Sequence, residues 1–193
     1  ACVFEGIVPV TIKLHVVLTR SNSQFFADEL ERYVRKNYES AKPGFIIPKN
    51  YRLDSNKRLK DSILVANIKQ IWSELPLELK EDFILPWFKK IISSERDFCN
   101  EFFITSKQLK DLDQTGMIVG SHGYSHTSLK LLTQKDQNKE IAKSKAIIES
   151  IVGHSISFFS YPFGEYNKQT LQVLNKLGFK GAVVYNHGRH IHD

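Results

Sequence analysis

Residues 103–193 alternate between helix-like and strand-like segments, and this alternation limits the possible folds more than any other feature of the chain. Three segments place apolar residues at helical spacing and end at a glycine: 104–116, 133–153 and 167–178. Each is followed by a short apolar segment with the composition of a strand: 117–121, 155–160 and 179–185. Helices and strands that alternate with short connections are typical of an α/β domain with a parallel sheet.

Capping patterns support the predicted helices. Thr105 and Gln108 match a capping box, and Gly116 is a suitable stop for the short helix between them. Asn167 is the expected N-cap of the last helix, and Gly178 its expected stop. These local signals predict where the helices begin and end.

The first hundred residues have a different pattern. Residues 8–19, "VPVTIKLHVVLT", are rich in β-branched side chains and predict a strand that is buried on at least one face. Residues 20–102 show apolar stripes at helical spacing, interrupted by prolines, and no constellation of polar groups. We therefore expect residues 1–19 and 103–193 to form one α/β portion, and residues 20–102 to form a helical insertion without metal ligands.

Composition excludes several classes of protein. The 193 residues are 41% hydrophobic and 25% charged, and they lack an apolar run long enough to span a bilayer. The net charge of +6 comes from lysines dispersed among acidic residues, so we expect no nucleic-acid partner and no stable membrane insertion. The two cysteines and the many lysines favour a cytoplasmic location, although the segment starts at Ala1 and a leader could precede it.

Two histidines lie just after a predicted strand. His122 and His126 belong to "GSHGYSHTSL", residues 120–129, and the turn "YPFG", residues 161–164, follows the next strand. The carboxyl ends of parallel strands meet at one edge of a sheet, so these two loops are expected to converge. Imidazoles four residues apart can face one divalent ion such as zinc, but the spacing alone is also compatible with two surface histidines.

The order of these motifs resembles the polysaccharide deacetylases, carbohydrate esterase family 4. The loop "SHGYSHTS" is similar to the family's [ST]-H-x-x-x-H-[ST] motif, and "YPFG" to its Pro-aromatic-Gly turn, within a resemblance that covers roughly residues 103–186. The resemblance implies a distorted (β/α) barrel, incomplete here and carrying a helical insertion. It also implies hydrolysis of an acetyl group, more often N-acetyl than O-acetyl, on a sugar or polysaccharide.

The same resemblance assigns roles to individual residues. It implies that His122 and His126 are ligands of a divalent metal, which in this family is often zinc. It makes the backbone amide of Phe163 a candidate donor to the oxyanion, with Tyr161 and Pro162 beside the carbohydrate substrate. The alternative for the three residues of the turn is an ordinary structural role.

Several family features are missing from the sequence. The Asp-Asp motif that supplies the base and the third metal ligand is not found, so it either lies upstream of Ala1 or has been lost. Ser160 stands where many members have arginine, and no convincing motif supplies the general acid. The late histidines His187, His190 and His192 are not expected to form a metal site. A catalytically inactive, deacetylase-like carbohydrate-binding domain therefore remains the alternative, and the sequence leaves the substrate and oligomeric state open.

Overall fold

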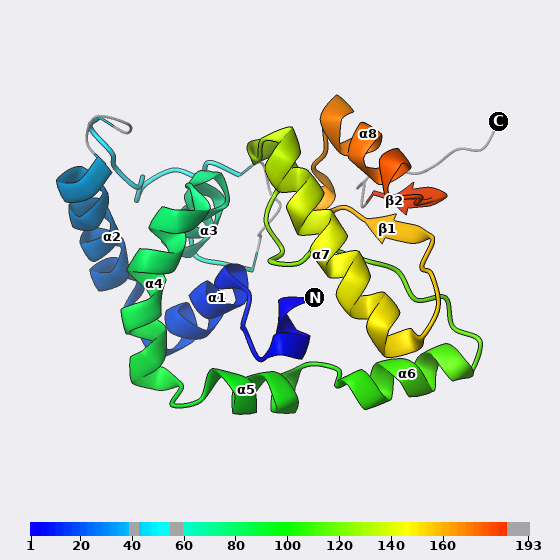
Figure 1. Ribbon diagram of the computed structural model, residues 1–193. Helices are drawn as coiled ribbons and strands as arrows, with labels where there is room; N and C mark the ends of the chain where they lie inside the picture. Colours follow the sequence, from blue (N-terminus) through cyan, green and yellow to red (C-terminus); the bar gives the residue numbers. More distant parts are fainter. Residues whose placement is uncertain (39–42, 55–59, 185–193) are drawn as a thin grey trace. The chain divides into compact units, whose positions relative to one another are not determined.

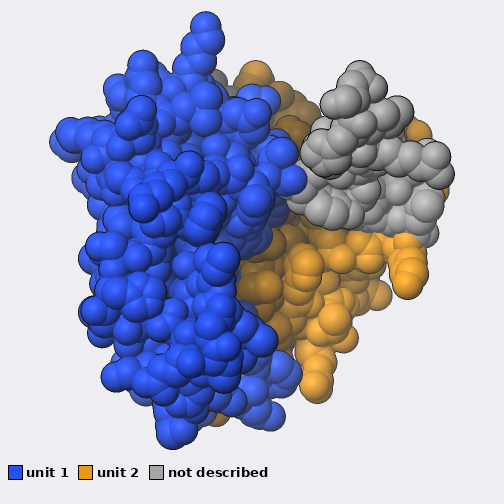
Figure 2. All heavy atoms as spheres, turned by 90° about the vertical axis from the view of Figure 1, so that its right-hand side faces the viewer, with its two compact units in different colours: residues 1–9, 95–193 blue, residues 10–94 orange. Residues whose placement is uncertain are grey.

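The computed structural model describes residues 1–38, 43–54 and 60–184, and it divides the chain into two compact units. One unit consists of residues 1–9 and 95–193, and the other of residues 10–94, as coloured in Figure 2. Helices predominate in both, and strands are few (Figure 1). The compact helical unit, 10–94, overlaps most of the segment expected to be an insertion, 20–102.

The unit of residues 10–94 contains only helices among its described residues. They are α1 (Val10–Arg20), α2 (Ser23–Tyr38), α3 (Ile63–Glu74) and α4 (Leu77–Ile91). The largest fully buried side chains of this unit are aromatic or aliphatic, and they include Phe26, Trp72 and Phe88. Their burial gives the unit a hydrophobic core of its own, as expected for apolar stripes at helical spacing.

The prediction of a strand at residues 8–19 is wrong, because α1 occupies most of this segment. Val10, Leu14 and Val17 are buried at helical spacing, and α1 packs against α4. Residues 14 and 17 would point to opposite faces of a strand, whereas they share one face of a helix. The burial of this face against α4 outweighs the β preference of the branched side chains, because local propensity differs by less than tertiary packing contributes.

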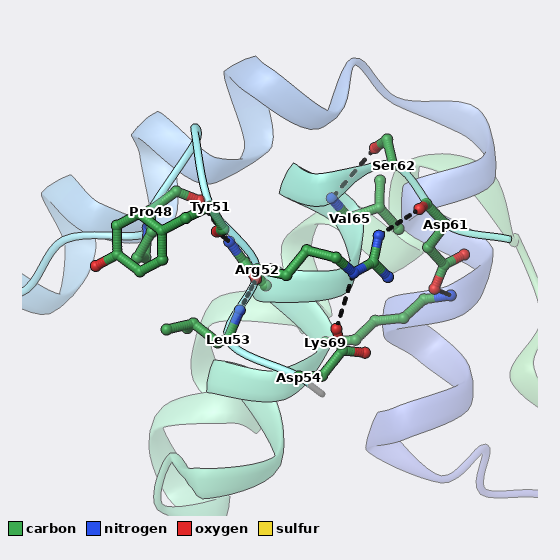
Figure 3. Close-up of polar contacts among 10 residues, drawn as sticks. Pro48, Tyr51, Arg52, Leu53, Asp54, Asp61, Ser62, Val65 and Lys69 are labelled. Carbon is green, nitrogen blue, oxygen red and sulfur yellow. Dashed lines mark hydrogen bonds and ion pairs between the residues drawn. The ribbon is translucent and has the colours of Figure 1, made fainter. Parts of the chain in front are cut away.

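A buried amide connects the loop before α3 to the helix. The side chain of Asn67 accepts a hydrogen bond from the amide of Leu53 at 2.8 Å, and it donates to the carbonyls of Pro48 and Tyr51 at 2.8 and 2.7 Å. Figure 3 shows the same region, where Arg52 lies between the carboxylate of Asp54 and the backbone of the segment that precedes α3. These bonds satisfy backbone groups that no strand or helix pairs.

The other unit carries the α/β elements. Its helices are α5 (Glu95–Phe102), α6 (Ser106–Gln114), α7 (Gln134–Val152) and α8 (Lys168–Lys176). Its strands are β1 (Phe158–Ser160) and β2 (Gly181–Val183), and its 3-10 turns are η1 (Cys2–Glu5), η2 (Leu129–Leu131) and η3 (Pro162–Gly164). The predicted capping box of Thr105 and Gln108 is confirmed, and so is Asn167 as the N-cap of α8.

The sheet of this unit is small and parallel. β1 pairs with β2 in the register Phe158 to Gly181, and Ser121 forms a parallel bridge to Phe159 on the other side of β1. The predicted strand at 117–121 is therefore present only as this bridge at its last residue. No closed barrel is seen among the described residues. The α/β class with parallel pairing is what the structure establishes.

The buried face of this sheet packs against α7 and α8 (Figure 1). Phe159 and Tyr161 lie in the hydrophobic core between them, together with Ile141 of α7 and Leu174 of α8. α7 connects Ser121 to β1 and α8 connects β1 to β2, so both helices are crossovers between parallel neighbours. This arrangement places the residues that follow Ser121 and Ser160 at the carboxyl end of the sheet.

Candidate metal and substrate site

The histidine loop, residues 121–128, begins at a fixed point of the sheet. The amide of Ser121 donates to the carbonyl of Phe158 at 2.9 Å, and the amide of Ser160 donates to the carbonyl of Ser121 at 2.8 Å. The buried hydroxyl of Ser121 also lies 2.7 Å from the hydroxyl of Ser144 on α7. The start of the loop is therefore held by both β1 and α7.

A backbone carbonyl determines the tautomer of neutral His122. Its Nδ1 lies 2.8 Å from the carbonyl oxygen of Ser160, and a carbonyl oxygen can only accept a hydrogen bond. The neutral ring must therefore carry its proton on Nδ1, which leaves the lone pair of Nε2 for another partner. A histidine that donates its second ring N–H to a carbonyl has the arrangement usual for metal ligands.

The ring of His126 lies close to that of His122. The two ring centroids are 5.0 Å apart, with the rings inclined at 64°. This proximity confirms that the two histidines of the motif face one another rather than opposite sides of the sheet. Their role as metal ligands stays a prediction.

His126 also contacts the second loop. Its ring meets that of Phe163 edge to face, with centroids 4.8 Å apart. His126 and Phe163 are the two non-glycine residues with positive φ in the described ranges, both at 59°. A left-handed backbone is unfavourable for residues with a Cβ, and it persists where the surrounding structure imposes it. The two loops therefore converge in conformations that their own sequences do not favour.

Glu140 of α7 holds the middle of the histidine loop. Its Oε1 accepts hydrogen bonds from the amide of Ser125 at 2.5 Å and from the hydroxyl of Ser125 at 3.0 Å. The same hydroxyl lies 2.9 Å from that of Thr127. Gly123 has φ +79°, and a Cβ at this position would lie 3.3 Å from Glu140 Oε1. The carboxylate of Glu140 thus replaces the backbone pairing that the loop lacks next to His126.

Tyr124 provides a further anchor for the loop. Its hydroxyl donates to Glu5 at 2.6 Å, and Lys143 of α7 lies 3.0 Å from the same carboxylate and 3.8 Å from the centre of the Tyr124 ring. The hydrogen bonds from Tyr124 and Lys143 lower the pKa of Glu5, and burial raises the pKa of Tyr124. No local pattern in the sequence predicts the roles of Glu5, Glu140 and Lys143, because their contacts join residues distant along the chain.

The turn "YPFG" presents one exposed side chain. Tyr161 is buried and stacks on Tyr166 with centroids 4.5 Å apart, and burial raises its pKa. Pro162 is also buried, whereas Phe163 is 42% exposed. The predicted substrate contacts of Tyr161 and Pro162 stay predictions, and the packing of the two side chains shows that they also support the turn.

The backbone of the turn uses two of its amides internally. The amide of Gly164 donates to the carbonyl of Tyr161 at 3.0 Å, and the amide of Glu165 donates to that of Pro162 at 3.1 Å. The amide of Phe163 is not among the donors of these two bonds, which is compatible with its predicted role as a donor to an oxyanion. Ser128 donates to the carboxylate of Glu165 at 2.5 Å and so joins the turn to the end of the histidine loop.

The donor set fits part of a metal site. His122 and His126 provide two neutral nitrogen ligands, and the carbonyl of Ser160 gives His122 the required tautomer. Within residues 1–38, 43–54 and 60–184, no group of three or more His, Cys, Asp or Glu side chains is placed to hold an ion. A complete site would need a further, preferably anionic ligand. The late histidines His187, His190 and His192 lie outside the described residues.

Residues 88–182 match the model of the polysaccharide deacetylase family, and the match includes both loops. This part of the chain belongs to the polysaccharide deacetylases. The family assignment suggested by the two motifs is therefore confirmed.

Individual relatives show similarity over the same region. The deacetylase segment is 33% identical to the polysaccharide deacetylase candidate YxkH of Bacillus subtilis over 85 residues, 44% of this chain and 30% of that protein. It is 33% identical to the peptidoglycan deacetylase of Helicobacter pylori over 75 residues, 39% of this chain and 26% of that protein. The matches span less than a third of the length of these curated relatives.

A solved structure is similar to the deacetylase segment as well. The Streptococcus pyogenes deacetylase PplD in complex with acetate is 29% identical, with a TM-score of 0.45 over 48% of this chain and 41% of that one. Among the described helices of the present chain, none combines the length and the apolar character required to cross a membrane.

Proposed function

We propose that this chain supplies the histidine loop and the oxyanion turn of a metal-dependent hydrolase that removes acetyl groups, N-acetyl in preference to O-acetyl, from a sugar or polysaccharide. The observation that supports this most directly is the pair of His122 and His126, with Nδ1 of His122 bonded to the Ser160 carbonyl. This hydrogen bond leaves the Nε2 lone pair of neutral His122 available, which is the arrangement usual for a metal ligand. The family of residues 88–182 points to the same chemistry.

The proposed metal is a divalent ion, with zinc preferred because its ligands are imidazoles. Such an ion, when bound, polarises an acyl carbonyl and lowers the pKa of a water molecule. The residues of this chain have separate tasks. His122 and His126 hold the ion, the Ser160 carbonyl keeps His122 in the ligand tautomer, and the amide of Phe163 donates to the developing oxyanion.

We also propose that the parallel sheet belongs to a distorted (β/α) barrel of the deacetylase type, with the helical block 20–102 as an insertion. Three consecutive parallel positions, at Ser121, β1 and β2, with α7 and α8 as crossovers, support this arrangement. Because the described residues provide two neutral ligands and no anionic one, we expect the 193-residue chain alone to bind zinc weakly and to lack turnover.

The test compares this chain with the same chain extended by the coding sequence upstream of Ala1. Zinc content after dialysis and acetate release from N-acetylated oligosaccharides are measured for both. We expect the extended chain to bind zinc and to release acetate, and His122→Ala in it to abolish both. His15→Ala replaces an exposed histidine on α1 and is the matched control, expected to change neither.

Two results would contradict the proposal. Strong turnover by the 193-residue chain would show that its own residues supply the third ligand and the base. An extended chain that binds sugar tightly but releases no acetate would support the alternative, a catalytically inactive carbohydrate-binding domain.

A further inference from the structure

The helical unit of residues 10–94 contains a hollow between α2 and α4. Its volume is about 410 Å³, within the range of roughly 300–1,000 Å³ that small-molecule sites occupy. Its walls consist of aromatic residues and a proline together with side chains of both charges. Nothing in the family match explains this hollow, because all of its lining residues precede residue 88.

Aromatic rings form one wall of the hollow. Trp87 is held between two phenylalanines of α2, with ring centroids 5.8 Å from Phe25 and 5.2 Å from Phe26. Tyr33 packs against Phe83 at 5.2 Å. Rings fixed in this way offer a flat apolar surface that loses little conformational entropy when a ligand covers it.

Charged residues from both helices complete the lining, and their charges balance. Arg32 and Lys36 of α2 provide two positive charges, and Glu29 and Asp82 provide two negative charges. Arg32 is paired with Glu29 across one turn of α2. A strongly anionic ligand would meet the two carboxylates, and a strongly cationic ligand would meet the guanidinium and the ammonium group. The balance therefore favours an uncharged ligand with many hydrogen-bonding groups.

Pro86 removes one backbone donor from the part of α4 that lines the hollow. It lies inside α4 and has no amide hydrogen, so the helix cannot supply the usual i to i−4 donor for the carbonyl of Asp82. Both Asp82 and Pro86 line the hollow. The burial of Tyr33 raises the pKa of its hydroxyl, and the nearby Asp82 carboxylate raises it further. The Asp82 carboxylate and the Tyr33 hydroxyl thus both contribute acceptor atoms to the lining.

We infer that this hollow binds an uncharged saccharide. The apolar C–H face of a pyranose ring would lie on Trp87 and Tyr33, while its hydroxyl groups would donate to Asp82 and accept from Asn37 and Lys36. A saccharide is the ligand class that combines a flat apolar face with a rim of groups that both donate and accept. This site is separate from the histidine loop, and the inference does not rest on the proposed hydrolysis.

Calorimetry on the 193-residue chain provides the test, with three tetrasaccharides of different charge. We expect uncharged N-acetylchitotetraose to bind with a dissociation constant of about 1 mM or tighter. Its fully deacetylated, cationic form and anionic tetragalacturonate should bind more weakly. Titration should also change the fluorescence of Trp87, and Trp87→Phe should remove most of this change, since Trp72 is buried.

The variants separate the hollow from the rest of the chain. Asp82→Asn should weaken binding of the uncharged probe by about tenfold, because a hydrogen bond to a charged acceptor is lost. It should also improve binding of the anionic probe relative to the uncharged one, since the wall then carries net positive charge. Glu78→Gln, an exposed position on α4 outside the hollow, is the matched control and should bind as the unmodified chain does.

Circular dichroism confirms that each variant is folded before titration. The inference fails if no uncharged saccharide binds at millimolar concentration, or if either charged probe binds best to the unmodified chain. It also fails if Asp82→Asn and Glu78→Gln weaken binding equally, because the sugar would then occupy another surface.

Discussion

His126 and Phe163 contact each other edge to face at 4.8 Å, and each has a backbone φ of 59°. They belong to different loops, one after Ser121 and the other after β1, that meet at the carboxyl end of the sheet. Since a positive φ costs a residue with a Cβ roughly 1–2 kcal/mol, the packing between the loops must offset this cost. The contact therefore links the candidate ligand His126 to the candidate oxyanion turn.

Substitution of Phe163 tests this backbone strain. Phe163→Ala and Phe163→Gly both remove the ring, but glycine adopts a positive φ without steric cost. We expect Phe163→Gly to be more stable than Phe163→Ala by about 1 kcal/mol in the free energy of unfolding measured with urea. Equal stability of the two variants, or greater stability of the alanine variant, would show that the turn is not strained in solution.

Glu140 is expected to determine the shape of the histidine loop. Glu140→Ala leaves the amide of Ser125 without its acceptor and should lower the free energy of unfolding by about 1–3 kcal/mol. Glu140→Gln retains a carbonyl oxygen and should cost clearly less. Lys139→Ala, at the exposed neighbouring position, is the control and should stay within about 0.5 kcal/mol.

Chemical shifts can show whether Glu140 positions the histidine loop or only stabilises the protein. Amide chemical shifts of residues 122–127 should change in Glu140→Ala and return in Glu140→Gln. Unchanged shifts in the alanine variant would mean that the carboxylate does not position the loop.

The pair of His154 and Asp113 should make stability depend on pH. Nε2 of His154 lies 2.9 and 3.0 Å from the two carboxylate oxygens of Asp113, and this bond, together with the Ser155 carbonyl, raises the histidine's pKa above its usual 6.5. A raised pKa in the folded state stabilises the protein fully below about pH 6.5. That stability is lost as the pH rises through the pKa of the folded state.

The measurement compares melting temperatures of the unmodified chain and His154→Gln on both sides of this transition. We expect the unmodified chain to lose more stability than the variant between about pH 5.5 and pH 8.5. An NMR titration should place the pKa of His154 above 6.5, and a value below 6.5 would contradict the pairing.

The helical assignment of α1 has a direct mutational signature. Leu14→Ala and Val17→Ala should both lower the free energy of unfolding, the first by about 2–5 kcal/mol, because both side chains are fully buried. His15→Ala, exposed on the same helix, should change it by less than about 0.5 kcal/mol. A strand would place residues 14 and 17 on opposite faces, so a large effect at only one of them would contradict the helix.

Features that depend on neighbouring residues could be predicted from the sequence alone. The caps at Thr105 and Asn167 and the helix stop at Gly153 follow from local patterns, and the structure confirms them. The caps and stops depend on backbone geometry within a few residues, which the sequence specifies directly. The order of the histidine motif and the turn "YPFG" also indicated the family, which the match of residues 88–182 bears out.

Features that depend on distant partners became visible only once the chain was folded. α1 is helical because Leu14 and its neighbours bury one face against α4, and this burial outweighs the strand preference of its β-branched residues. Glu140 supports the histidine loop from α7, and the Ser160 carbonyl sets the tautomer of His122. The positive φ of His126 is likewise imposed by packing. Contacts between residues far apart in the chain supply the free energy for each of these features, and no local pattern in the sequence records such contacts.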